Sequence, residues 1–288
     1  MASGQVTEKE RSFLDPPYTM ESLAAIMRYL RGPEGCPWDQ TQTAVSIRNN
    51  ILEEAAEAVE ALDRRDWKNF REELGDLLLQ VVFQAQIAEA DGSFDFNDIV
   101  DGLCRKLIAR HTHVFGADRA ATSDEALNVW QKNKEAAKVA AGETTDAPIS
   151  AGMRALPTEL PRLIRAHKVQ KKAAEPGFDW TDVSDMWEKL DEEIFELKSA
   201  AAEGDPAACT EELGDLLFMT VNLARHLGVN ADAALATATR KFVDRFERME
   251  LLCAADGVNL KDLDPETQED YWRAAKREEA NESRKGKK

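Results

Sequence analysis

The chain of 288 residues lacks any apolar run that approaches the roughly 20 residues needed to cross a bilayer. Its N-terminal stretch 1–17 is polar and acidic, without the basic start and apolar centre that are typical of a signal peptide. Only four cysteines are present, without a C-x-x-C pair, so neither a zinc knuckle nor a disulfide framework is indicated. We therefore expect a protein of the reducing cytoplasm with no membrane partner.

Positive charge is also scarce, since 37 Lys and Arg stand against 54 Asp and Glu and give a formal net charge of −17. Nonspecific nucleic-acid binding depends on neutralising phosphates with Lys and Arg, so stable binding of nucleic acid is not expected. The basic tail, residues 281–288, is interpreted as a solvated terminus. An anionic substrate would need a local device, either a metal ion or a focused basic cluster.

No alternating strand pattern of useful length is present, and helical periodicity dominates, which predicts an all-α fold. One apolar stripe, for example, runs through Ile51, Ala58, Val59 and Leu62. A stretch of small and polar residues with several prolines predicts a linker over 139–157, between domains at 18–138 and 158–280. The helices are predicted over 41–64, 67–90, 96–110, 123–137, 183–203, 207–227, 231–255 and 265–280.

The most informative feature that is present is a duplicated set of acids with the spacing E-x-x-E…E-x-x-D. Each set is preceded by one more acid, Glu53 or Glu192, and ends in an identical Glu-Leu-Gly-Asp-Leu-Leu run. The second set lies 139 positions after the first (193 − 54), and the residue type is the same at every position. The two sets are Glu54, Glu57, Glu73 and Asp76, and Glu193, Glu196, Glu212 and Asp215.

Paired acids are common on exposed helices, but these pairs lie at the edge of an apolar stripe rather than opposite it. If the two helices of each half pack antiparallel through their stripes, the two pairs face each other and their mutual repulsion calls for cations. Oxygen ligands without His or Cys suit Mg²⁺ or Mn²⁺ rather than zinc. A di-iron bundle would need a Glu-x-x-His, which neither half contains.

Basic and aromatic residues flank both sets of acids. Lys241 and Arg245, at i and i+4, could bind phosphate oxygens, and so could four further residues, namely Lys106, Arg110, Lys168 and Lys171. Three aromatic positions, Trp38, the Phe178/Trp180 pair and Trp272, either stack on a base or anchor a loop into the core. A packing role is expected for His111 and His113, and a helix-dipole role for His226.

The run Gly35-Cys36-Pro37-Trp38-Asp39, the E-E-x-x-E of 53–57, the E-x-x-D of 73–76 and their second copies resemble MazG-type nucleoside triphosphate pyrophosphohydrolases. The likeness covers residues 20–276, in the family's two-domain form. It implies tandem four-helix units, usually assembled as a homodimer. It also implies hydrolysis of nucleoside triphosphates, ribo- or deoxyribo-, to a monophosphate and pyrophosphate with Mg²⁺, for which Mn²⁺ can substitute.

The resemblance places the metal ligands on the eight acids of the two sets. It adds a nucleotide-binding set of Lys189, Glu192, Glu211, Asp215, Lys241, Arg245 and Trp272, beside Lys168, Lys171, Lys106 and Arg110. The water-activating base is expected among Glu192 and Glu193, or Glu53 and Glu54 in the first copy. Which half is active stays open.

Two rival interpretations remain. One keeps the fold and changes the substrate to dUTP or to a phosphoribosyl-nucleotide, although the duplicated layout argues against both. The other is a regulatory helical module whose acids bind Mg²⁺ or Ca²⁺ structurally, although the Asp/Asn/Gly-rich spacing of calcium loops is absent from the sequence.

Overall fold

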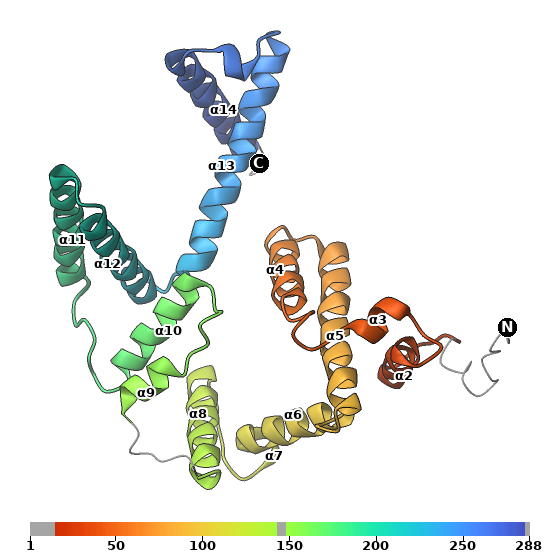
Figure 1. Cartoon of the computed structure of the whole chain (residues 1–288). Helices are drawn as coiled ribbons and strands as arrows, with labels where there is room; N and C mark the ends of the chain where they lie inside the picture. Colours follow the sequence, from red (N-terminus) through yellow and green to blue (C-terminus); the bar gives the residue numbers. More distant parts are fainter. Residues whose placement is uncertain (1–14, 143–147, 286–288) are drawn as a thin grey trace. The chain divides into compact units, whose positions relative to one another are not determined.

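A computed structural model describes residues 15–142 and 148–285 (Figure 1). The remaining positions hold most of the N-terminal extension, part of the expected linker and the end of the basic tail. No strand occurs among the described residues, so the predicted all-α class is confirmed. Within this part of the chain, no helix combines the length and the apolar character that a membrane span requires.

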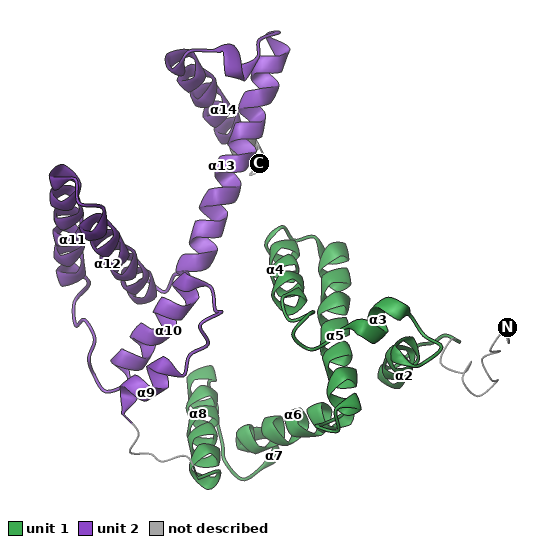
Figure 2. Cartoon of the chain, viewed as in Figure 1, with its two compact units in different colours: residues 1–143 green, residues 144–288 purple. Residues whose placement is uncertain are grey.

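The contacts divide the chain into two units, residues 1–143 and 144–288 (Figure 2). In the first unit, α4 and α5 form an antiparallel hairpin, α2 packs on α5, and α8 packs on α6. The helices of this unit are α2 (Met20–Arg31), α3 (Pro37–Thr41), α4 (Asn50–Asp63), α5 (Trp67–Ala90), α6 (Phe96–Arg110), α7 (Thr112–Phe115) and α8 (Ser123–Ala140).

In the second unit, α11 and α12 form the corresponding hairpin, α10 packs on α12, and α14 folds back onto α13. The start of α13 contacts α10 and α12, whereas its far end carries α14 (Figure 1). The elements are α9 (Ile149–Arg154), α10 (Arg162–Ala174), α11 (Val183–Glu203), α12 (Pro206–His226), α13 (Ala231–Ala255), the 3₁₀ turn η2 (Leu260–Asp262) and α14 (Pro265–Lys285).

Short, well-capped turns close both hairpins. Asp66 accepts a hydrogen bond from the Asn69 backbone at the start of α5, and Asp205 accepts from two backbone N–H groups at the start of α12. The residue before each cap has a left-handed backbone, with φ of 57° at Arg65 and 68° at Gly204. These positions are 139 apart, so the duplication preserves the turn that sets both acid-bearing helices side by side.

Two expectations need correction. The helix predicted over 41–64 begins only at Asn50, because Thr43 and Ser46 exchange side-chain and backbone hydrogen bonds that hold a turn. Five helices are missing from the predicted set, namely α2, α3, α7, α9 and α10. Of these, α3, α7 and α9 have only 5, 4 and 6 residues, and α10 begins directly after Pro161. The other predicted segments match observed helices to within a few residues.

The predicted apolar stripe of α4 is also largely exposed. Ala58 is buried, but Val59 is 59% exposed and Leu62 is 43% exposed. The first unit instead builds its core from α2, α5 and α6, around Met27, Ile47, Val82, Phe83, Ala85, Ile87 and Phe96. The second unit has a smaller core of Met186, Met219 and Leu223, packed against Trp180, Val183 and Leu190.

Candidate metal and nucleotide site

Each hairpin gathers three carboxylates at its seam. In each cluster, one oxygen per residue lies within 4.8 Å of the others, and two acids come from the first helix and one from the second. The fourth predicted acid, Asp76 or Asp215, falls outside these triads but lies near enough for its charge to act on them. The triads are Glu54, Glu57 and Glu73, and Glu193, Glu196 and Glu212.

The electrostatics of the triads show the repulsion that their spacing predicts. Desolvation, followed by the charge of a neighbouring glutamate, raises the pKa of both Glu73 and Glu212. Desolvation and then the charge of Asp76 raise the pKa of Glu54 in the same way. Clustered carboxylates with raised pKa values and no His or Cys among them match the donor set of a hard divalent cation.

A lysine distinguishes the second triad from the first. Lys189 donates to Glu192 and to Glu193, with both nitrogen–oxygen distances at 2.9 Å, and Glu193 is only 6% exposed. The hydrogen bond to Glu192 and then that to Glu193 raise the pKa of Lys189. The aligned residue in the first unit is Asn50 (189 − 139), and there Glu54 accepts instead from Gln80 at 3.4 Å.

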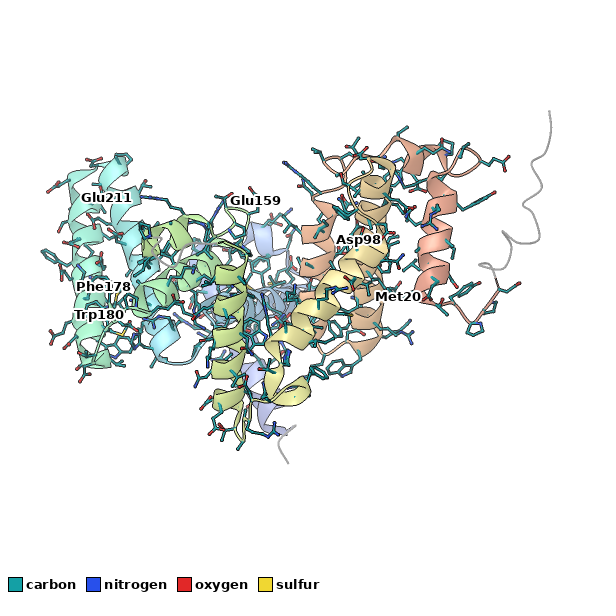
Figure 3. All side chains as sticks on the ribbon, turned by 90° about the horizontal axis from the view of Figure 1, so that it is seen from below. Met20, Asp98, Glu159, Phe178, Trp180 and Glu211 are labelled. Carbon is teal, nitrogen blue, oxygen red and sulfur yellow. The ribbon has the colours of Figure 1, made fainter. Side chains whose placement is uncertain are left out.

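A cavity of about 710 Å³ opens beside the second triad. Its acidic end is formed by Glu193 and Asp215, which α11 and α12 bring together near the middle of the hairpin. Its other end is closed by the 177–181 loop, whose aromatic residues Phe178 and Trp180 line it. Figure 3 shows these two aromatic residues at one end of the hairpin and Glu211 toward the other. The volume falls within the range of pockets that hold small-molecule ligands.

A polar network fixes the closed end of the cavity. Asp179 accepts from Arg225 and from the His226 ring, with the Nη1–Oδ2 and Nε2–Oδ1 distances both 2.9 Å. The Arg225 guanidinium also donates to Oδ1 of Asn222, at 3.2 Å from Nε and 2.7 Å from Nη2. The hydrogen bond from Arg225, and after it the hydrogen bond from His226, hold the pKa of Asp179 well below its usual range. His226 is the last residue of α12, the position that its expected helix-dipole role requires. Its ring also contacts Asp179, a partner that the sequence does not predict.

The first unit fills the corresponding place with an aromatic ring. Phe83 aligns with Asn222 (222 − 139) and is 4% exposed. The Trp38 ring packs edge-on against it at 6.4 Å between centroids, and the Arg31 guanidinium lies 5.3 Å from the ring centre. The two halves therefore share their acids but differ in the space beside them.

The predicted nucleotide-binding residues are only partly brought together. Lys189 and Asp215 line the cavity, whereas Glu192 and Glu211 lie on the same helices outside its lining. Five other predicted residues of the second unit also lie outside that lining, namely Lys168 and Lys171 on α10, Lys241 and Arg245 on α13, and Trp272 on α14. Trp38, another predicted aromatic position, belongs to α3 of the first unit.

The distant basic residues have local partners instead. Arg245 pairs with Glu279 of α14, and Trp272 packs on Phe242 with 5.0 Å between ring centroids. In the first unit, Arg110 and Lys134 lie over the Trp130 ring at 4.8 and 5.5 Å, while Lys106 is exposed on α6 and Glu53 on α4. Within one copy of the chain, α13 and α14 therefore do not complete the cavity.

The cavity residues that sequence reasoning misses include Gln170, Asp179, Asn222 and Arg225. A signal for two of them is present in the duplication. At the aligned positions, the buried Phe83 is replaced by the polar Asn222, and Gln86 is replaced by the charged Arg225. A difference between two otherwise similar copies marks a place where one copy has a separate task.

Comparison with known proteins relates nearly the whole chain to nucleoside triphosphate pyrophosphohydrolases. Residues 42–115 match the model of the MazG nucleotide pyrophosphohydrolase domain, and residues 159–242 match that of phosphoribosyl-ATP pyrophosphohydrolase. A nucleoside triphosphate pyrophosphohydrolase of Escherichia coli strain K12 is 45% identical over 267 residues, which are 90% of this chain and 98% of that protein.

A second relative and one solved structure come from Thermotoga maritima. The nucleoside triphosphate pyrophosphohydrolase/pyrophosphatase MazG of that organism is 43% identical over 256 residues, 89% of this chain and 95% of its own. The crystal structure of a mazG-related protein aligns with 40% of this chain and 99% of its own, at 26% identity and a TM-score of 0.35.

Proposed function

The chain belongs to the MazG family of nucleotide pyrophosphohydrolases, and we propose that its second unit hydrolyses nucleoside triphosphates, ribo- and deoxyribo-, to monophosphate and pyrophosphate. The observation that carries this assignment is the cavity beside Glu193 and Asp215, which joins an acidic cluster to a space of ligand size. The first unit repeats the acids, but Phe83 fills the aligned place. We therefore assign catalysis to the second unit.

The residues of the second triad fit Mg²⁺, because three carboxylate oxygens converge within 4.8 Å and no soft ligand is among them. Glu193, Glu196 and Glu212 would hold the ion, with Asp215 next to them at the cavity. When bound, a divalent cation neutralises triphosphate charge and makes nearby water more acidic.

The protein's own groups then orient the reaction. Water attacks the α-phosphorus in line, the bond to the bridging oxygen of the β-phosphate breaks, and pyrophosphate leaves. We assign the proton of the attacking water to Glu192, which Lys189 holds beside Glu193 and whose side chain is 56% exposed. The Lys189 ammonium also offers positive charge at the acidic end of the cavity.

The direct test is a panel of nucleoside triphosphates and deoxynucleoside triphosphates with MgCl₂, scored for pyrophosphate and for orthophosphate. We expect pyrophosphate and the monophosphate in equal amounts, with turnover abolished by EDTA. Orthophosphate as the first product would place the cleavage at a different bond, and a panel left intact would remove the assignment.

A second substrate has one observation in its favour. The second unit matches the model of phosphoribosyl-ATP pyrophosphohydrolase, whose name specifies a different nucleotide. The relatives that align over nearly the full chain are named for nucleoside triphosphates, which favours the first assignment. Adding phosphoribosyl-ATP to the same panel, and comparing kcat/KM, separates the two.

Metal binding should stabilise the protein more at high pH than at low pH. Glu54, Glu73 and Glu212 have pKa values raised above their ordinary 4.5, so the folded protein binds more protons than the unfolded chain just above that pH. The free energy of unfolding of the metal-free protein therefore falls as the pH rises through that window. Asp179 acts in the opposite direction, but only below its ordinary value of 3.8.

At pH 8 the repulsion is fully present, so saturating MgCl₂ should raise the Tm by about 5 °C, and by clearly less at pH 5. Calorimetry at both pH values measures the difference, with NaCl of equal ionic strength as the control. An equal rise with NaCl would mean that general screening, rather than a bound divalent ion, relieves the carboxylates.

We further propose that the protein is a homodimer through the exposed apolar face of α13. Phe242 is 56% exposed, Val243 57% and Phe246 39%, an arrangement that is costly on a monomer surface. Lys241 and Arg245 lie on the same helix. In a single copy, Lys241 and Arg245 lie outside the cavity lining. In the proposed dimer, these two residues of the second copy lie near the phosphates of the bound nucleotide.

Replacing both Phe242 and Phe246 by Glu should convert the dimer to a monomer, because four like charges would meet at the paired faces. Sedimentation velocity measures the change, and circular dichroism should show unchanged helicity. The matched control is Leu251→Glu. Leu251 is 65% exposed and lies nine residues after Phe242, on about the opposite side of α13. A double variant that sediments like the wild type would exclude this face.

A further inference from the structure

Gln170, a residue that lines the cavity, holds a buried acceptor without a partner in the described part of the chain. It lies on α10, is 4% exposed and lines the cavity. Its Nε2 donates to the Phe218 carbonyl of α12 at 2.7 Å, whereas its Oε1 is buried and has no hydrogen-bond partner within the described part of the chain. Buried acceptors are rarely left unpaired, so this oxygen calls for a donor on whatever occupies the cavity.

Asn222 presents a donor close by. Its Oδ1 is engaged by Arg225, so its Nδ2 is the end of the amide that is left for the cavity. Phe218, which holds the Gln170 side-chain amide, and Asn222, whose side-chain amide is held by Arg225, are four residues apart on α12. The two side-chain amides are therefore held about one helical turn apart. Asp179 in turn holds the Arg225 guanidinium.

On the basis of the proposed function, we propose that Gln170 and Asn222 read the hydrogen-bonding edge of the nucleobase. Gln170 Oε1 accepts an N–H of the base, and Asn222 Nδ2 donates to a neighbouring ring nitrogen or carbonyl. Trp180 lines the same cavity and offers its ring to the base, while Asp179 and Arg225 are positioning residues that set the Asn222 amide. The acids at the opposite end bind the triphosphate.

The duplication supports this pairing of roles. The residues of the first unit that align with Asn222 and Gln170 are Phe83 and Leu30, since Arg31 aligns with Lys171 at an offset of 140. Both amides are therefore present in the unit that has the cavity, and both are replaced by apolar residues in the unit where Phe83 is buried.

The test compares kcat/KM for ATP and for purine riboside triphosphate, which carries hydrogen in place of the 6-amino group. The wild-type protein should prefer ATP by about tenfold or more, because the analogue leaves Gln170 unpaired. Gln170→Leu should bring the ratio to within about threefold of one by lowering the value for ATP. Gln131→Leu, an exposed glutamine of α8, is the control and should keep the wild-type ratio.

Asn222→Asp provides a second variant, because it replaces the donor by an acceptor without changing size, and it should lower kcat/KM for ATP about tenfold. A Gln170→Leu protein that is folded by circular dichroism and keeps the wild-type ratio overturns the inference. A variant that instead alters the preference between ATP and dATP assigns the two amides to the sugar and overturns it as well.

Calorimetric binding of adenosine and of purine riboside, without metal, separates this inference from the proposed function. Binding that favours adenosine in the wild type and loses the preference in Gln170→Leu supports the base-reading edge even if no triphosphate is hydrolysed. Hydrolysis of triphosphates together with equal binding of both nucleosides retains the proposed function and removes the edge.

Discussion

Glu193→Ala should lower kcat for pyrophosphate release by roughly 100- to 1,000-fold, the loss that is typical when one preorganised electrostatic partner is removed from a reaction centre. Glu193 is the buried member of the second triad, it lines the cavity, and it shares Lys189 with Glu192. Removing it takes away one oxygen of the triad and frees the lysine to pair with Glu192 alone.

The variant should remain folded. Glu193 carries one of the negative charges that raise the pKa of Glu212, so its removal relieves repulsion in the metal-free protein. Thermal unfolding without metal should therefore give a Tm at or above the wild-type value, while the Mg²⁺-dependent rise in Tm is reduced. A lost activity accompanied by lost helicity would instead indicate a structural role.

Two matched substitutions make the result specific. Glu54→Ala removes the aligned acid of the first unit and should lower kcat by less than about threefold, because Phe83 fills the place beside that triad. Glu188→Ala removes an exposed acid of α11 outside the triad and should be neutral. Equal losses in Glu54→Ala and Glu193→Ala would contradict the assignment of catalysis to the second unit.

The acids of the site are predictable from sequence because they depend on short-range geometry. The i, i+3 spacing, the turn at Arg65 or Gly204 and the capping aspartates are all local features, and together they place Glu212 opposite Glu193. The all-α class follows from the same periodicity. The all-α class needs no knowledge of which helices touch, whereas the facing of the acid pairs assumes that the two consecutive helices pack as an antiparallel hairpin.

The cavity is less accessible to such reasoning because it depends on a tertiary contact. It exists where α10 and the 177–181 loop cover one side of α12, and α10 is preceded by prolines that favour a linker interpretation. The placement of Gln170 in that wall follows only from the α10–α12 packing. The apolar stripe of α4 fails as a core prediction for a related reason, since periodicity indicates an apolar face but not what covers it.

Asn222→Phe should close the site of the second unit by copying the first. A phenylalanine at this position would place a ring where Phe83 lies in the aligned helix, in the space that the base needs. We expect kcat/KM to fall at least about 100-fold for every nucleotide, mostly through KM, because the substrate loses its binding space rather than its reacting groups. Steady-state kinetics across the nucleotide panel measures the loss.

The control for the added bulk is Asn222→Ala, which removes the amide but leaves the space, and it should cost about tenfold or less. Equal losses in the two variants would attribute the effect to the missing amide rather than to the filled cavity. The Tm of Asn222→Phe should not fall, since the ring joins the apolar wall formed by Trp180 and Met219.

The reverse change, Phe83→Asn, should cost about 3 kcal/mol or more of stability, because it removes a buried ring from the main core of the first unit. It should not create activity there, because Asn50 stands where the second unit has Lys189 and Leu30 where it has Gln170. Urea unfolding measures the first expectation. Pyrophosphate release in a Glu193→Ala background measures the second, and recovery of turnover would mean that the Phe83 ring alone keeps the first unit silent.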